Sequence, residues 1–91
     1  MGNVISEYLR SNSSHDHPIK GCDLASHFDI TGVKVRKAVN DARCSGIPIC
    51  ASSQGYFYSD SKEQIKKTIE SMRGRIISQE NAIAGLESLV L

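Results

Sequence analysis

Residues 28–58 restrict the fold of this chain more than any other part of its 91 residues. They contain, in order, the end of one helix, a tight turn, a basic helix and a short β-hairpin. Asp29 and Ile30 form the turn, and Thr31 is well placed as the N-cap of the basic helix, where its hydroxyl accepts from a free backbone amide. Gly46 is the stop signal of that helix. This order predicts a helix-turn-helix unit that continues directly into a hairpin.

The basic helix, residues 31–45, has one apolar face. Val35, Val39 and Ala42 recur at i, i+4 and i+7 and are expected to face the core. Residues 32–43 hold four basic residues and one acidic residue, a local net charge of +3 in a chain whose net charge is only +1. A local patch of this sign attracts a phosphate backbone. The rest of the circumference is expected to carry Lys34, Arg36, Lys37, Ala38, Asn40 and Asp41.

Two short strands are predicted after the basic helix. Residues 47–51 form the first strand and residues 56–59 the second, because apolar and aromatic residues flank a small polar cluster. Pro48 has no amide hydrogen, so the first strand is expected at an edge of the sheet. The turn between the strands contains Ser52, Ser53, Gln54 and Gly55.

The residues before this unit are predicted to supply the rest of a small core. Apolar residues at helical spacing predict a first helix over residues 3–10, followed by a polar loop over residues 11–16. Residues 17–20 form an extended connector, because Pro18 biases the residue before it away from the helical conformation. A second helix over residues 21–28 is expected to turn inward Leu24, Ala25 and Phe28.

Four short motifs stand in this order within residues 20–58: Asp23-Leu24-Ala25 with Phe28, Ile30 to Lys37, Gly46 to Ile49, and Gly55-Tyr56. Through these motifs, residues 20–58 resemble the winged helix-turn-helix module at the N-terminus of bifunctional biotin ligase repressors and of many small prokaryotic and phage regulators. The resemblance implies an α+β fold of three helices and a β-hairpin wing over residues 1–60, with double-stranded DNA as the ligand. It does not extend to a ligase domain, so it implies no biotin chemistry.

The resemblance places the DNA-binding surface on the basic helix and the hairpin, and the side-chain chemistry agrees. An α-helix fits the major groove, where Arg or Lys pairs with guanine and Asn pairs with adenine. Hydroxyl and amide groups at the hairpin tip suit phosphate oxygens or the minor groove. A solvated helix face without a ligand is the alternative explanation. The predicted DNA-binding residues are Thr31, Lys34, Arg36, Lys37, Asn40, Arg43, Ser52, Ser53 and Gln54.

Residues 61–91 are predicted to form a second unit, a long helix from Lys62 to about Leu89. Seven of eight a and d positions in a heptad repeat are apolar, which predicts self-association through a coiled coil. A dimer is favoured, and a higher oligomer is the alternative. The a and d residues, which are the predicted oligomerisation residues, are Ile65, Ile69, Met72, Ile76, Gln79, Ile83, Leu86 and Val90.

Two features of this coil have alternatives: the relative direction of its helices, and whether the helix packs against a second copy or against its own domain. β-Branched residues at every a position favour a parallel pair, in which Arg75 of one chain faces Glu80 of the other. Alternatively, the helix folds back onto residues 1–60, which the apolar residues outside the repeat would suit. Four heptads span about 40 Å, too long for that domain to cover fully, and this favours self-association. The apolar residues outside the repeat are Ile77, Leu89 and Leu91.

No other chemistry is indicated. The sequence has no phosphate-binding glycine loop, nucleophile elbow or spaced carboxylate pair, so neither an enzyme nor a cofactor is expected. His15, His17 and Cys22 lack the paired spacing of zinc ligands, so no metal is expected. The absence of a signal peptide and of a long apolar run indicates a cytoplasmic protein with no membrane partner. The resemblance implies a prokaryotic or phage source. Cys22 and Cys44 are expected to pack between helices, and Cys50 to lie in a strand.

Two functions fit these observations. The leading hypothesis is a sequence-specific double-stranded DNA-binding protein that acts as a coiled-coil dimer, in transcription regulation, at a phage or plasmid replication site, or in DNA organisation. The alternative is a protein-interaction module, in which the winged domain is a scaffold and the final helix docks into a larger assembly. The nearly neutral net charge of +1 favours the alternative more than the first.

Overall fold

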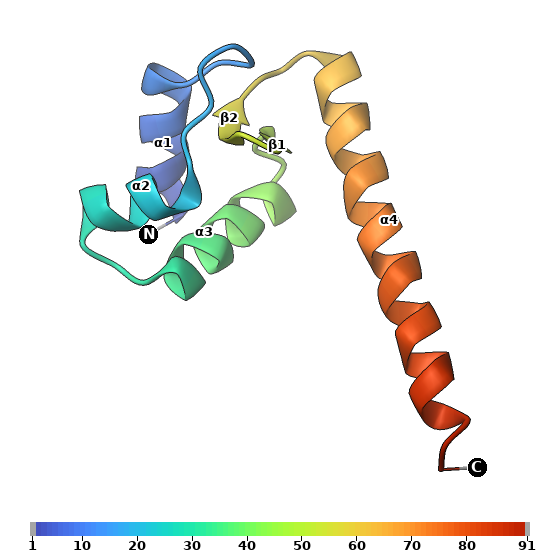
Figure 1. Cartoon of the computed structure of the whole chain (residues 1–91). Coiled ribbons are helices and arrows are strands. Elements are labelled where there is room, and N and C mark those ends of the chain that lie inside the picture. The colour runs from blue at the N-terminus through green and yellow to red at the C-terminus, as the bar shows by residue number, and fades with distance from the viewer. Residues whose placement is uncertain (1, 91) are drawn as a thin grey trace.

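A computed structural model of the chain describes residues 2–90, and for residues 2 and 3 only the backbone. The described part is an α+β arrangement, as predicted, with a two-stranded antiparallel sheet. Figure 1 shows the helices that precede the hairpin gathered with it into one body, from which the last helix extends. The elements are α1 (Gly2–Asn12), α2 (Gly21–Phe28), α3 (Gly32–Cys44), β1 (Ile49–Ser52), β2 (Gly55–Tyr58) and α4 (Lys62–Glu87).

The core lies between α1, α2, α3 and the hairpin. Each of its large apolar side chains contributes about 1.5–3 kcal/mol relative to an exposed position. Ala38 also belongs to this core, with only 3% of its surface exposed, so its predicted place on the open face of α3 is wrong. Ala38 lies three residues after Val35 and therefore shares its face of the helix. The most deeply buried side chains are Ile5, Leu9, Leu24, Val35, Val39, Cys50 and Phe57.

Side-chain hydrogen bonds extend α1 beyond its predicted end at Arg10. The Asn12 amide donates to the carbonyl oxygen of Tyr8 over 2.9 Å. The Ser13 hydroxyl donates to the carbonyl oxygen of Leu9 and accepts from the Tyr58 amide over 3.0 Å. Ser13 therefore caps α1 and also attaches it to the end of β2.

The predicted ends of the first strand and of the last helix also shift. Ile47 does not belong to β1, because its amide donates to the carbonyl oxygen of Ala42 over 3.0 Å and closes the end of α3. α4 ends at Glu87 and not at Leu89. The Ser88 amide donates to the carbonyl oxygen of Ala84 over 3.1 Å at this end.

The turn between α2 and α3 has the predicted cap. The Thr31 hydroxyl accepts from the Lys34 amide over 3.2 Å. Asp29 adopts a left-handed conformation with φ of 53°, and the Ile30 amide donates to the carbonyl oxygen of Ala25 over 3.0 Å. These bonds satisfy the free backbone groups at the facing ends of the two helices and so fix the angle between them.

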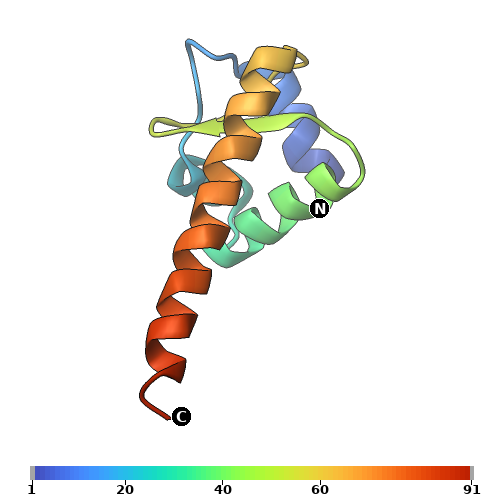
Figure 2. The same ribbon diagram turned by 90° about the vertical axis from the view of Figure 1, so that its right-hand side faces the viewer.

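Neighbouring segments bind the outer edges of both strands of the hairpin. Ile19 pairs with Tyr56 through two backbone hydrogen bonds of 2.8 Å, so the connector before α2 covers the outer edge of β2. On β1, the Ala51 amide donates to the Thr68 hydroxyl of α4 over 3.2 Å. Figure 2 shows the hairpin turn projecting to the left of the body, with α4 crossing in front of the strands.

α4 has two parts with different surroundings. The docked half, residues 62–75, packs along β1, and Thr68 is buried there with 7% exposure. The free half is the rest of α4 together with the turn that follows it, residues 76–90. Every residue there is exposed, and Figures 1 and 2 show this part projecting away from the body. No helix within residues 2–90 combines the length and the apolar character needed to cross a membrane.

Candidate nucleic-acid interface

The exposed face of α3 brings together four of the predicted DNA-binding side chains. Lys34, Arg36, Lys37 and Asn40 are all exposed, on the side of the helix opposite its buried apolar face. Thr31 is also exposed, immediately before the first turn. Because its oxygen accepts from the Lys34 amide, its hydroxyl hydrogen stays available to a ligand oxygen.

The charge of this face is smaller than the sequence indicates. The Lys37 ammonium lies 3.6 Å from the Asp41 carboxylate, one helical turn further on. Both side chains are largely exposed, so the pair is worth less than about 1 kcal/mol and opens readily to a phosphate. Without Arg43, the face has three basic residues and one acidic residue, a net charge of +2.

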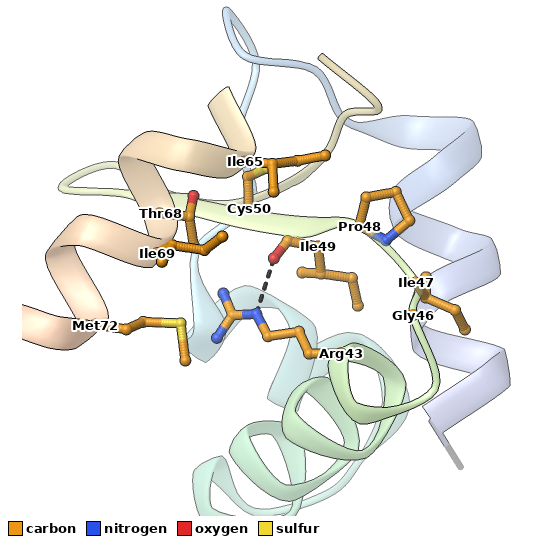
Figure 3. Close-up of a pocket in the computed structure, with 10 residues that line it drawn as sticks. All are labelled: Arg43, Gly46, Ile47, Pro48, Ile49, Cys50, Ile65, Thr68, Ile69 and Met72. Carbon is orange, nitrogen blue, oxygen red and sulfur yellow. Dashed lines mark hydrogen bonds between the residues drawn. The ribbon is translucent and has the colours of Figure 1, made fainter. Parts of the chain in front are cut away.

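Arg43 is not part of the exposed face. Its Nε donates to the carbonyl oxygen of Ile49 over 2.8 Å, and its guanidinium carbon lies 5.9 Å from the centre of the Tyr56 ring. Figure 3 shows the side chain directed between β1 and α4. The structure thus separates Arg43 from the other predicted DNA-binding residues and uses it to join α3 to the hairpin.

The Arg43 guanidinium is only partly satisfied. Its Nη2 is buried and has no hydrogen-bond partner among the described residues. Burial lowers the pKa of Arg43, and the nearby charge of Arg75 lowers it further, while Tyr56 and Cys50 act in the opposite direction. Arg43 and Arg75 both line a polar pocket of about 160 Å³ near the turn end of the hairpin.

A second, mainly apolar pocket of about 320 Å³ lies between the body and α4 (Figure 3). We call it the α4 groove. Its walls are Arg43 at the end of α3, residues 46–50, and one side of the docked half of α4. The α4 residues that line it are Ile65, Thr68, Ile69 and Met72.

The hairpin tip presents the three remaining predicted DNA-binding residues. Ser52, Ser53 and Gln54 are exposed, and the Ser52 hydroxyl accepts from the Gln54 amide over 3.2 Å. Gly55, with φ of 138°, brings this turn against the backbone of Ile19. The tip is therefore a fixed polar turn, with donors and acceptors suited to a phosphate oxygen.

Val33 is a residue of the exposed α3 face that the sequence analysis missed. It lies in the first turn of α3, and 65% of its surface is exposed. Val33 is outside the i, i+4, i+7 pattern of the buried residues of α3, and from this position its exposure could have been predicted. An exposed methyl group on this face can contact a thymine methyl group.

The cysteines and histidines form no compact site. Cys22 and Cys44 are exposed, so their expected packing between helices is wrong, whereas Cys50 is buried in β1 as expected. The His15 ring packs edge-on against Phe57, and the His27 ring lies tilted against the Tyr8 ring. Within residues 2–90, no three histidine, cysteine or acidic side chains are grouped closely enough to hold a metal ion.

The predicted oligomerisation residues fall into two groups. Ile65, Ile69 and Met72 line the α4 groove, which agrees with the folding-back alternative for this part of the helix. The group from Ile76 onward lies in the free half. Leu91, which was expected outside the repeat, is beyond the described residues.

The surfaces available to a partner are thus the basic face of α3, the hairpin tip and the apolar side of α4. No known family model, curated protein or solved structure matches the chain.

Proposed function

We propose that residues 2–60 form a winged helix-turn-helix that binds double-stranded DNA, with α3 in the major groove and the hairpin as the wing. One observation carries the proposal. A capped helix has one face buried in the core and presents Lys34, Arg36, Lys37 and Asn40 together on the other. The fixed polar tip of the hairpin supplies a second point of contact.

The side chains of the exposed α3 face divide into two roles. Arg36 and Asn40 lie one turn apart and have the planar groups that pair with guanine and adenine edges. Lys34, Lys37 and the Thr31 hydroxyl are suited to phosphate oxygens, which position the helix without selecting a sequence. A net charge of +2 on this face makes the affinity of one domain modest and dependent on salt.

Self-association through α4 completes the proposal. Two weak contacts held on one molecule bind with a higher effective affinity than either alone. The exposed stripe of the free half, which includes Ile83 at 54% and Leu86 at 66% exposure, supports an oligomer. A symmetric dimer would bind two half-sites related by a two-fold axis, about one helical turn of DNA or more apart.

The DNA-binding part is tested by fluorescence anisotropy with labelled duplexes of random sequence at low salt. Arg36→Ala and Lys37→Ala should each weaken binding by about three- to tenfold, since each removes one positive charge from the face that attracts the phosphate backbone. Lys67→Ala is the matched control. Like Lys37, Lys67 is exposed and paired with a carboxylate one turn away, Glu63, at 3.5 Å, but it lies on α4.

The control variant should bind as the wild type does. No binding at low salt, or equal losses in all three variants, would contradict DNA binding through α3. Selection of bound sequences from random duplexes would then define the half-site and its spacing.

Self-association is tested by sedimentation of the full chain. Ile83→Asp should convert an oligomer into a monomer, because a carboxylate on the apolar stripe has no partner when buried. Ile77→Asp is the matched control, because Ile77 is equally exposed, at 57%, but lies outside the heptad stripe. A wild-type chain that is monomeric at about 0.1 mM would contradict the oligomer.

A second candidate function is binding of a protein through the same face. The exposed Val33 and the chain's net charge of +1 favour it. In that case Val33→Asp should abolish capture of the partner, and the wild-type chain should bind no duplex at low salt.

A further inference from the structure

The charge of α4 changes sign along its length. Residues 62–75 have five basic and two acidic side chains, a net charge of +3, whereas residues 76–90 have two acidic side chains and no basic one. Two such helices in parallel register place halves of like charge side by side. An antiparallel pair places each positive half against a negative half, so the Coulomb interaction favours the antiparallel pair.

The apolar stripe of α4 also fits an antiparallel pair. One register joins an a position to a d position in every layer, which is how the apolar residues of two helices interdigitate. All the residues of its inner layers lie within α4. Across the two copies these layers are Ile69 with Leu86, Met72 with Ile83, and Ile76 with Gln79.

The charged residues beside the stripe select the same register. It brings the Lys66 ammonium of one copy to Glu87 of the other, and Arg73 to Glu80. The two-fold axis repeats each pair, so four pairs of opposite charge form. In the parallel register, Arg75 with Glu80 is the only pair of opposite charge among these flanking positions, and it forms twice. Both counts follow from the spacing of the charges in the sequence.

The structure leaves the required surface open. Ile69 is 42% exposed at the open side of the α4 groove, although the neighbouring Thr68 is buried against β1, where its hydroxyl accepts from the Ala51 amide. Figure 3 shows Ile69 and Met72 on one side of the groove, with Pro48 and Ile47 on the other. All residues of the free half are exposed, so its apolar stripe is accessible to the groove of a second copy.

We propose that two copies of this chain associate through an antiparallel pair of α4 helices. The acidic free half of each copy lies along the basic docked half of the other and covers the open side of its α4 groove. Leu86 and Leu89 of the second copy lie against Ile47 and Pro48. This proposal rests on the self-association proposed above and fixes the direction of the helices.

Charge exchange distinguishes the two directions. Arg73→Glu and Glu80→Arg should each weaken the dimer by about tenfold, since each replaces two symmetric attractions by repulsions. The double variant with both changes should recover the wild-type dissociation constant, because it restores the antiparallel pair. The matched double variant, Arg75→Glu with Glu80→Arg, restores only the parallel pair and should remain weak. Sedimentation equilibrium at low salt measures all of these constants.

The outcomes separate this proposal from the proposed function. Recovery in the Arg75 double variant, or a dimer that none of these changes affects, overturns the antiparallel direction and leaves self-association intact. A monomeric wild type overturns both direction and self-association. DNA binding by α3 is measured independently of either result.

A distance measurement gives a second test that leaves the ion pairs in place. Ser88→Cys, in a chain with Cys22→Ser and Cys44→Ser, allows a spin label near the end of α4, while Cys50 is buried. In the antiparallel pair the two labels lie about 30 Å apart along the axis, since position 88 of one copy lies beside position 67 of the other. A separation of less than about 20 Å would show parallel helices and overturn the proposal.

Discussion

Single residues fix the position of the hairpin, and Gly55 is the clearest case. Its φ of 138° is rarely adopted by other residues, and a Cβ there would lie 2.5 Å from the carbonyl oxygen of Ile19. We expect Gly55→Ala to lower the free energy of unfolding by about 2–4 kcal/mol, from backbone strain and from the clash. Urea unfolding followed by circular dichroism measures the change.

Gly46→Ala is the matched comparison for Gly55. Gly46 also has a positive φ, of 85°, but open space surrounds the position of its Cβ. Its replacement should cost only about 1 kcal/mol, from the backbone alone. Equal losses in the two variants would show that the contact with Ile19 does not hold the hairpin.

At the residue scale, a structural feature can be predicted from the sequence when it depends only on residues nearby in the chain. The Thr31 cap is confirmed because an N-cap depends on residues within one helical turn. The position of Arg43 could not be predicted in this way. It is at the edge of the exposed arc of α3, where the carbonyl oxygen of Ile49 and the Tyr56 ring, both in the hairpin, determine its direction. Cys44 is likewise exposed because no element covers the end of that face.

At the scale of elements, the attachment of α4 to the hairpin depends on Thr68. Its hydroxyl accepts from the Ala51 amide and donates to the carbonyl oxygen of Gln64 over 3.1 Å. Thr68→Val keeps the shape but leaves the partly buried Ala51 amide without this partner, so it should destabilise the fold by about 1–2 kcal/mol. Faster hydrogen exchange at the Ala51 amide should accompany the loss.

Thr68→Ser keeps the hydroxyl and is the control for this prediction. It should retain the protection of the Ala51 amide, even though the lost methyl group lowers stability slightly. If Thr68→Val leaves that amide as well protected as in the wild type, the hydroxyl is not what attaches α4 to β1.

The order of the elements was predictable from the sequence, but which part of α4 packs against the body was not. Turn residues and apolar spacing are local, and they gave four helices and a hairpin in the observed order. A heptad stripe shows only that one side of a helix avoids water. It is the same whether Ile69 faces β1 or a second copy, so the division of α4 into docked and free halves required the structure.

At the scale of the whole molecule, the domain and the free half of α4 are expected to act through separate surfaces. Ile83 lies in the free half, away from the core and from α3, so its carboxylate variant should keep the folded structure of residues 2–60. If the protein binds DNA as a dimer, Ile83→Asp should nevertheless weaken binding to a two-half-site duplex by about 100-fold or more. Binding to a single half-site should not change.

Anisotropy titrations with the two duplexes measure this coupling. Ile77→Asp, outside the stripe, should bind both duplexes as the wild type does. Equal affinity of Ile83→Asp and the wild type for the longer duplex would mean that each domain binds alone.

The exposure of the free half also bears on how the protein responds to its own abundance. Residues 76–90 are all exposed in a single copy, so its core of residues 2–60 does not depend on them. Under the proposed function, the dimer forms only above its dissociation constant, and below it the occupancy of a paired site rises with about the square of the chain's concentration. A twofold change in expression would then change occupancy about fourfold, which gives a threshold response without any small-molecule effector.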